Sequence, residues 1–282
     1  MEREFEAVNL QHLNKVGENS HPNGLAFLLG QLETPIDRGL FGMENVEPDW
    51  NKNYACHRYL DDDHFILSDY TKKGYKTLFA EDWASGVFNY PDCWGFKNKP
   101  VTHYMKPFQL YYEQNLNRSL KFMGRDQCFE YHTFLLNYFK KFMAAYPKSP
   151  KAALVWASEI AHNYNDGLFH VDTQLFNFLR NFREQLDKSY LFFMGDHGIR
   201  WGKVRDTWLG EREINNPMMY VSVPRHLRNR INPILKDNSL KLLTSFDIHA
   251  SLVDILNDPQ LTSTHGPQDL RGNSFLRPLP PG

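Results

Sequence analysis

The sequence predicts an α/β fold, in which a mainly parallel sheet is flanked by helices. Apolar runs of strand length occur at residues 152–157 and 190–194. Apolar residues at helical spacing occur over 60–73 and 170–187. Because segments of the two kinds alternate along the chain, the strands are expected to run mostly parallel.

The first quarter of the chain is the least regular. Residues 1–19 are expected to form a helix or a strand remnant that ends in a turn at 17–19. The apolar run at 25–29 follows Pro22-Asn23-Gly24 and predicts the first turns of a helix. Residues 31–56 are polar and contain several Pro, Gly and Asn, so they are expected to lie on the surface.

The later elements follow in alternation. Residues 82–108 are rich in aromatics and turn residues, and at that length they should pack as a lid or as a cleft wall. The other expected elements are a helix over 60–73, a strand over 74–80, a helix over 126–146, a strand over 152–157, an amphipathic helix over 170–187, strands over 190–194 and 218–223, a capped helix over 245–256 and an irregular tail after 258.

Composition excludes several classes of function. The chain has 282 residues and a formal net charge of −1, so no overall field attracts nucleic acid or an anionic membrane. No apolar run approaches the length of a membrane span. The first six residues, Met-Glu-Arg-Glu-Phe-Glu, are too polar for a signal peptide.

Three cysteines, Cys56, Cys93 and Cys128, lie far apart and show no zinc-binding spacing. One disulfide with one free thiol and three reduced thiols are both compatible with the sequence. The redox compartment therefore stays open at this point.

The most informative motif is Gly195-Asp196-His197-Gly198, directly after the apolar run at 190–194. An Asp-His pair at the carboxyl end of a strand would place an oxygen and a nitrogen ligand together at the mouth of a sheet. Both suit a divalent cation such as Zn²⁺ or Mn²⁺. The alternative is a solvated turn that contains the same two residues.

A second motif is Ser20-His21-Pro22-Asn23, just before the apolar run at 25–29. A hydroxyl at a helix N-terminus lies where backbone N–H groups and the helix dipole favour anions, which suits a nucleophile for phosphate or sulfate esters. Taken alone, this motif is better explained by Ser20 as a plain N-cap with Pro22 in the first turn.

Together the two motifs resemble the alkaline-phosphatase-like superfamily, which includes sulfatases, nucleotide pyrophosphatase/phosphodiesterases and lipoteichoic acid synthases. Ser20-His21-Pro22-Asn23 is similar to the phosphodiesterase motif Thr-x-Pro-Asn. The following Ala26-Phe27-Leu28-Leu29-Gly30 is similar to the helix of sulfatases, whose motif Arg is replaced here by Gly24.

The chain most resembles an animal sulfatase-like family catalogued as domain of unknown function 229. The similarity runs over nearly the whole chain. It rests on the order of several short motifs: 74–77 running into Glu81-Asp82, 104–108, 196–200, 205–213, 246–252 and 271–275.

This resemblance implies a set of site residues. Asp196 and His197 would bind a divalent metal ion (Zn, Mn or Ca), and Ser20 would be the nucleophile and would also touch the metal. Asn23 would donate its amide to an oxygen of the substrate. His162 would contact the anionic group or the leaving oxygen. The alternatives are a turn residue for Asn23 and an ordinary loop histidine for His162.

Four other groups carry weaker expectations. Asp166 could serve a second metal and Arg205 could balance the charge of a substrate. His249 is expected to be structural. The acids of Asp61-Asp62-Asp63-His64 are expected to begin a helix, where they would complement its dipole.

Relatives place a metal-binding Asp on a strand upstream of the nucleophile, and the nineteen residues before Ser20 offer no such strand. We therefore expect a single domain over 1–282, truncated at its N-terminus and missing its first strand. The expected function is metal-dependent hydrolysis or transfer of small phosphate or sulfate esters, with weakened or absent catalysis in this chain. The resemblance implies the secretory pathway.

Two other functions stay open. The chain could be a non-catalytic binding or scaffold protein that retains the fold. The aromatic residues of 83–108 could instead form a carbohydrate-binding surface.

Overall fold

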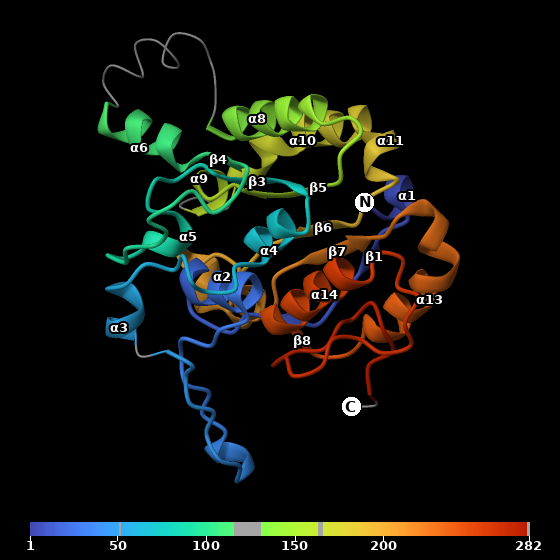
Figure 1. Ribbon diagram of the computed structural model, residues 1–282. Coiled ribbons are helices and arrows are strands. Elements are labelled where there is room, and N and C mark those ends of the chain that lie inside the picture. Colours follow the sequence, from blue (N-terminus) through green and yellow to red (C-terminus); the bar gives the residue numbers. More distant parts are fainter. Residues whose placement is uncertain (51, 116–130, 163–165, 281–282) are drawn as a thin grey trace. The chain divides into compact units, whose positions relative to one another are not determined.

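Helices and short strands alternate along the chain in the computed structural model, which describes residues 1–50, 52–115, 131–162 and 166–280 (Figure 1). The chain forms two units, one of residues 1–55 and 179–282 and one of residues 56–178. The prediction of a mixed α/β protein with parallel strand pairs is confirmed.

The first unit contains most of the short strands. Its helices and strands are α1 (Glu2–Phe5), β1 (Val8–Asn9), β2 (Leu13–Asn14), α2 (Ser20–Leu29), η1 (Gly39–Phe41), α11 (Arg183–Leu186), β6 (Leu191–Met194), η2 (Lys203–Asp206), α12 (Trp208–Asn215), β7 (Met219–Ser222), η3 (Arg225–Leu227), α13 (Arg228–Asn238), β8 (Leu243–Thr244) and α14 (Ser245–Asn257). Helix α3 (Lys52–Cys56) ends at the first residue of the second unit.

Strand direction in the first unit differs in part from the expectation. Strand β7 pairs antiparallel with both β1 and β6, in the order β1-β7-β6, whereas β2 and β8 are parallel. An apolar run indicates a strand but leaves its direction open, because direction depends on the neighbouring strand. The sheet that carries Asp196 is therefore antiparallel.

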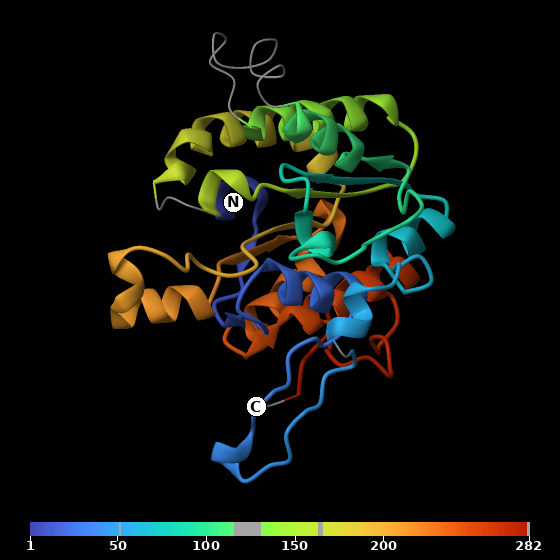
Figure 2. The ribbon, with the colours of Figure 1, turned by 90° about the vertical axis from the view of Figure 1, so that its left-hand side faces the viewer.

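Helices α2 and α14 pack against each other in this unit (Figure 2). Ala26 of α2 and Phe246 of α14 belong to one buried cluster with Leu32. Thr244 and Asp247 form a capping box at the start of α14, which confirms the capped helix expected at 245–256. Every residue of α2 after Ser20 is buried, so this helix is a fixed support.

Two buried arginines anchor the irregular and terminal parts of this unit. Arg277 in the tail donates two hydrogen bonds of 2.9 Å to the carboxylate of Asp254 in α14. Arg228 in α13 bonds to Asp187 at 2.6 Å and to Glu6 at 2.9 Å. Charged pairs of this kind tie distant segments together.

Part of the segment expected on the surface, 31–56, forms a narrow arm in both views (Figures 1 and 2), whereas Leu32 and Ala55 near its ends are buried. Backbone hydrogen bonds join Ile36 and Val46 across it. Leu40 at its tip is 98% exposed.

The second unit contains α4 (Ile66–Lys72), β3 (Lys76–Glu81), α5 (Gly86–Asn89), β4 (His103–Tyr104), α6 (Lys106–Gln114), α8 (Tyr131–Ala145), β5 (Lys151–Trp156), α9 (Glu159–His162) and most of α10 (Gly167–Asn181). The strands expected at 74–80 and 152–157 are confirmed as β3 and β5. The helix expected over 126–146 is found from Tyr131, and its first five expected residues lie outside the described part of the chain. The helix expected over 170–187 is divided at Phe182 into α10 and α11.

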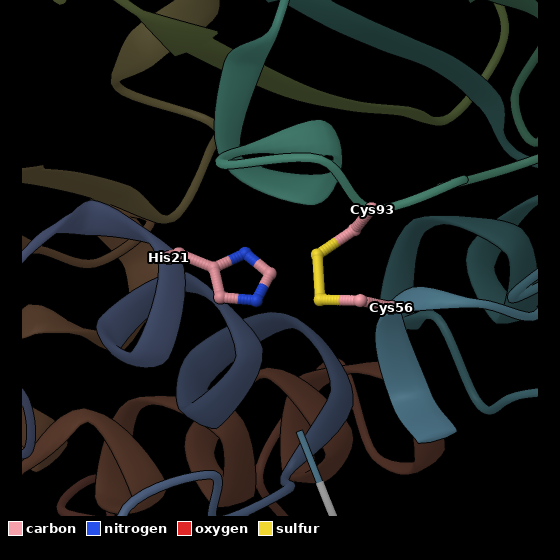
Figure 3. A group of neighbouring side chains, drawn as sticks. All are labelled: His21, Cys56 and Cys93. Atoms are coloured by element: carbon pink, nitrogen blue, oxygen red, sulfur yellow. A yellow bond between two sulfur atoms is a disulfide. The ribbon is translucent and has the colours of Figure 1, made fainter. Parts of the chain in front are cut away.

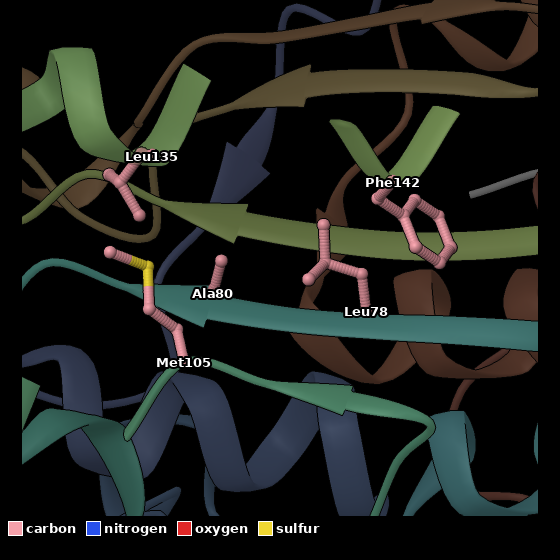
Figure 4. Close-up of a cluster of buried hydrophobic side chains, with 5 residues drawn as sticks. All are labelled: Leu78, Ala80, Met105, Leu135 and Phe142. Carbon is pink, nitrogen blue, oxygen red and sulfur yellow. The ribbon is translucent and has the colours of Figure 1, made fainter. Parts of the chain in front are cut away.

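The sheet of this unit is parallel throughout, in the order β4-β3-β5. Leu78 and Ala80 of β3 point toward Leu135 and Phe142 of α8, and Met105 completes the buried cluster (Figure 4). Phe88, in the segment expected to be a lid or a cleft wall, is only 2% exposed and contacts Phe65 and Phe79. That segment therefore contributes to the core.

Helix α4 begins at Ile66, later than the predicted helix. Asp61 instead accepts hydrogen bonds from the backbone N–H groups of Lys97 and Asn98. Asp63 pairs with Arg58 at 2.6 Å. The prediction that these acids begin a helix is wrong, because their side chains bind partners outside it. None of the described helices is long and apolar enough to cross a membrane.

Candidate functional site

Ser20 is the first residue of α2, and Asn19 is the N-cap. The side chain of Asn19 accepts a hydrogen bond of 3.0 Å from the backbone N–H of His21. The interpretation of Ser20 as a plain N-cap is therefore wrong, because Asn19 has already taken that role. The Ser20 hydroxyl is left for other partners.

Asp196 and His197 follow β6 as the sequence indicates, and the chain turns back toward the end of α12. The N–H of Gly198 donates to the carbonyl of Ile214 at 3.2 Å. A Cβ atom at Gly198 would lie 2.3 Å from the carbonyl oxygen of Glu213. Only glycine fits at this close approach, which explains the second glycine of the motif.

The ring of His197 is fixed by the chain next to it. Its Nδ1 lies 2.6 Å from the carbonyl oxygen of Gly198, so Nδ1 carries a hydrogen and donates it. In the neutral ring, Nε2 then presents its lone pair, and this atom lies 3.3 Å from the Ser20 hydroxyl oxygen. Metal-binding histidines are commonly oriented in this way, with the second ring nitrogen bonded to a carbonyl.

Asp196 completes the cluster with an unsatisfied carboxylate. Its Oδ2 lies 3.6 Å from Nε2 of His197, is buried and has no hydrogen-bond partner among the described residues. An unpaired buried carboxylate oxygen is costly, and here it faces a nitrogen that, in the neutral ring, offers only a lone pair. A cation between them would satisfy both. The donor set of carboxylate, imidazole and hydroxyl therefore fits a divalent metal ion.

Asn23 is bonded to the turn of residues 16–19 and has no hydrogen bond to Asp196 or His197 among the described residues. Its side chain is fully buried, and all its hydrogen bonds go to the turn before α2. A substrate oxygen would have to displace one of these bonds, so contact between Asn23 and a substrate stays a prediction.

The other candidate residues lie elsewhere. His162 is the last residue of α9, and both His162 and Asp166 belong to the second unit. Their predicted roles stay predictions. Nδ1 of His249 lies 3.1 Å from the carbonyl of Phe27, in keeping with the structural role expected for this histidine. Arg205 lies in η2.

Glu81 and Asp82, at the end of β3, are buried acids. In the sequence they were recognised only as part of a family motif, and no role was predicted for them. Burial raises the pKa of Glu81 and of Asp82 to about 7. Glu81 accepts a hydrogen bond from the N–H of Val87, and Asp82 accepts from the N–H groups of Ser158 and Glu159. Their place directly after an apolar strand was the signal for them.

Cys56 and Cys93 form a disulfide in the second unit (Figure 3). Of the two alternatives that the sequence left open, the structure shows the one with a disulfide. Cys128 lies outside the described residues. His21, also drawn in Figure 3, belongs to the first unit, where its ring lies 3.2 Å from the carboxylate of Glu33.

Comparison with known proteins gives one family. The family model described as "Protein of unknown function (DUF229)" matches residues 1–282. No curated protein matches the chain. The family match covers both motifs of the candidate site, and its description assigns no activity.

Proposed function

This chain belongs to the DUF229 family of proteins of unknown function, and we propose that it is a metal-dependent hydrolase or transferase of phosphate or sulfate esters with Ser20 as its nucleophile. The proposal includes a relationship to the alkaline-phosphatase-like superfamily. One observation carries it: the hydroxyl of Ser20 lies 3.3 Å from Nε2 of His197, and that nitrogen lies 3.6 Å from the unpaired Oδ2 of Asp196.

Asp196, His197 and Ser20 would hold the cation. When bound, it supplies positive charge that favours the ionised form of Ser20 and offsets the charge on the ester group. With two protein ligands besides the nucleophile, the site leaves coordination positions for a substrate, as catalytic metal sites do.

The residues themselves supply orientation and electrostatics. The Gly198 carbonyl holds the His197 ring with Nε2 toward Ser20. Because Ser20 begins a ten-residue helix, the positive end of the helix dipole favours an anionic ester in front of it.

In the proposed reaction, Ser20 releases its hydroxyl proton to solvent and its Oγ forms a bond to phosphorus or sulfur. The bond to the leaving alcohol oxygen breaks, and the alcohol takes up a proton. Water then attacks phosphorus or sulfur in the covalent ester, and the bond to Ser20 Oγ breaks. The phosphate or sulfate product leaves, and Oγ takes up a proton that the attacking water gives up.

The disulfide between Cys56 and Cys93 supports an oxidising compartment, because disulfides persist mainly in secreted proteins and in the secretory pathway. We therefore keep the secretory pathway as part of the proposal.

The decisive experiment measures hydrolysis of nitrophenyl phosphate, a nitrophenyl phosphodiester and nitrophenyl sulfate with Zn²⁺, Mn²⁺ or Ca²⁺. Ser20→Ala is the test variant. Ser189→Ala is the matched control, since the Ser189 hydroxyl makes a solvent-exposed hydrogen bond to the Gln185 carbonyl four residues earlier and lies outside the candidate site. We expect weak activity in the wild type and the control, in line with the weakened catalysis expected from the sequence, and none in Ser20→Ala.

Equal background rates in all three proteins would overturn the enzyme proposal. If the wild type then still bound a cation, the non-catalytic alternative would be favoured.

A further inference from the structure

We infer that Asn23 is a positioning residue, which holds the turn of residues 16–19 so that Ser20 faces His197, and that it does not contact the substrate. The effect on catalysis rests on the function proposed above, whereas the structural claim stands by itself. The inference reverses the role that the family resemblance implies for this residue.

The side chain of Asn23 uses all its hydrogen-bonding capacity on that turn. Its Oδ1 accepts from the N–H of Val16 at 2.8 Å and from the N–H of Gly17 at 3.2 Å. Its Nδ2 donates to the carbonyls of Gly17 and Asn19, each at 2.9 Å. An amide has two donor hydrogens and one oxygen with two lone pairs, so none is left for a ligand.

Burial leads to the same conclusion. Asn23 has no exposed surface. Turning its amide toward a substrate would leave the carbonyls of Gly17 and Asn19 without their donor. Leaving a buried polar group unpaired typically costs about 1–3 kcal/mol, which a single new bond to a substrate would barely offset.

The neighbouring proline acts on the same turn. A Cβ atom at Gly17 would lie 2.3 Å from Cγ of Pro22, so the turn packs directly on the proline ring. Pro22 therefore packs against the turn, and Asn23 holds the same turn by hydrogen bonds. The sequence Ser-x-Pro-Asn thus contains a nucleophile and, two and three residues later, the two side chains that fix the turn before it.

The turn that Asn23 holds is directly connected to Ser20. One of the carbonyls that Asn23 holds is that of Asn19, the N-cap of α2 and the residue directly before Ser20. A shift of the turn would therefore move the Ser20 hydroxyl relative to Nε2 of His197. Misplacement of a reacting group by about 1 Å can cost on the order of a hundredfold in rate.

The test compares Asn23→Ala and Gly17→Ala with the wild type. Leu235→Ala is the control for general destabilisation, because Leu235 is fully buried in α13 of the same unit and outside the turn. Three measurements are made on each folded protein. They are amide hydrogen exchange at Val16 and Gly17, the Ser20–His197 distance in a crystal structure, and kcat and KM for nitrophenyl esters with inhibition by inorganic phosphate.

We expect faster exchange at Val16 and Gly17 in Asn23→Ala and a Ser20–His197 separation beyond hydrogen-bond distance in both turn variants. We also expect kcat to fall about a hundredfold, with KM and the inhibition constant for phosphate changed less than about twofold. Leu235→Ala should keep exchange at the turn and kcat close to the wild type.

Amide hydrogen exchange at Val16 and Gly17 that is as slow in Asn23→Ala as in the wild type would overturn the inference. So would a rise in KM and in the inhibition constant at unchanged kcat, since this is the signature of a lost substrate contact. If the wild type hydrolyses none of the esters, the proposed function fails, but the exchange and distance measurements still decide the role of Asn23.

Discussion

Ser20 and His197 are 177 positions apart in the chain, yet the hydroxyl oxygen of one lies 3.3 Å from Nε2 of the other. Both belong to the first unit, so this contact forms within one packed body. Contacts between segments so far apart carry a large loop-closure cost and persist only where surrounding packing fixes both partners. Here α2 holds Ser20, and β6 with its following turn holds His197.

Replacing Asp196 by Asn should stabilise the metal-free protein and abolish its response to cations. The change removes an unpaired buried charge but also removes a ligand. We expect the melting temperature without metal to stay equal or rise, and the increase caused by added Zn²⁺ or Mn²⁺ to disappear. Asp206→Asn, at an exposed position, is the control and should respond to cations like the wild type. A cation-induced shift that survives in Asp196→Asn would contradict the site.

Gly198→Ala should destabilise the first unit by roughly 1–3 kcal/mol, because the new Cβ would lie 2.3 Å from the Glu213 carbonyl oxygen. Gly195→Ala is the matched control, since its Cβ would meet nothing closer than 3.5 Å. Urea unfolding of both variants measures the difference. Equal midpoints would show that the backbone tolerates a side chain at position 198.

Glu81 should make the protein less stable as the pH rises. Its pKa is raised from 4.5 to about 7 by burial, so the folded state holds a proton that the unfolded state releases. The stabilisation is complete below about pH 4.5 and is lost as the pH rises through about 7, by up to roughly 3 kcal/mol. Glu81→Gln keeps the acceptor for Val87 and should flatten this fall.

The measurement for Glu81 is the free energy of unfolding in urea between pH 4.5 and 7.5. Glu184→Gln, at an exposed position, is the control and should follow the wild type. The pKa of Asp82 is also raised by burial, so the free energy of unfolding of Glu81→Gln should still fall with pH, but less steeply than that of the wild type. Identical slopes in all three proteins would refute the prediction.

Removing the disulfide should lower the stability of the second unit. The bond joins residues 37 positions apart, and cross-linking a loop of that length stabilises by about 4 kcal/mol through the unfolded chain. The double variant Cys56→Ala, Cys93→Ala should unfold at lower urea concentration than the oxidised protein, and dithiothreitol should have no further effect on it. An unchanged midpoint after reduction of the wild type would argue against a closed disulfide.

Sequence patterns identified the helices and strands that are determined by residues close together in the chain. Apolar runs located β3, β5, β6 and β7, and Thr244 with Asp247 marked the start of α14. The candidate cluster of Ser20, Asp196 and His197 was also predicted, although only through two motifs read together. Each of these signals lies within a few residues of the structure it predicts.

The rest depends on partners far away in the chain. Helix α13 was not predicted. It contains Pro233, which normally ends a helix. Its first residue, Arg228, is anchored by Asp187 and Glu6. The antiparallel direction of β6 depends on β7 as its neighbour, and the capping role of Asn19 could not be distinguished from that of Ser20. Local spacing contains none of this information.

The pairing of β1 with β7 and of β2 with β8 joins the first 55 residues to the last 104 without using the chain between them. The first unit is thus assembled from two separate pieces of chain that recognise each other through strand edges and through the contact of α2 with α14. A protease cut in the intervening stretch would leave Ser20 on one fragment and Asp196 with His197 on the other. Those fragments would remain held together as a nicked, non-covalent complex.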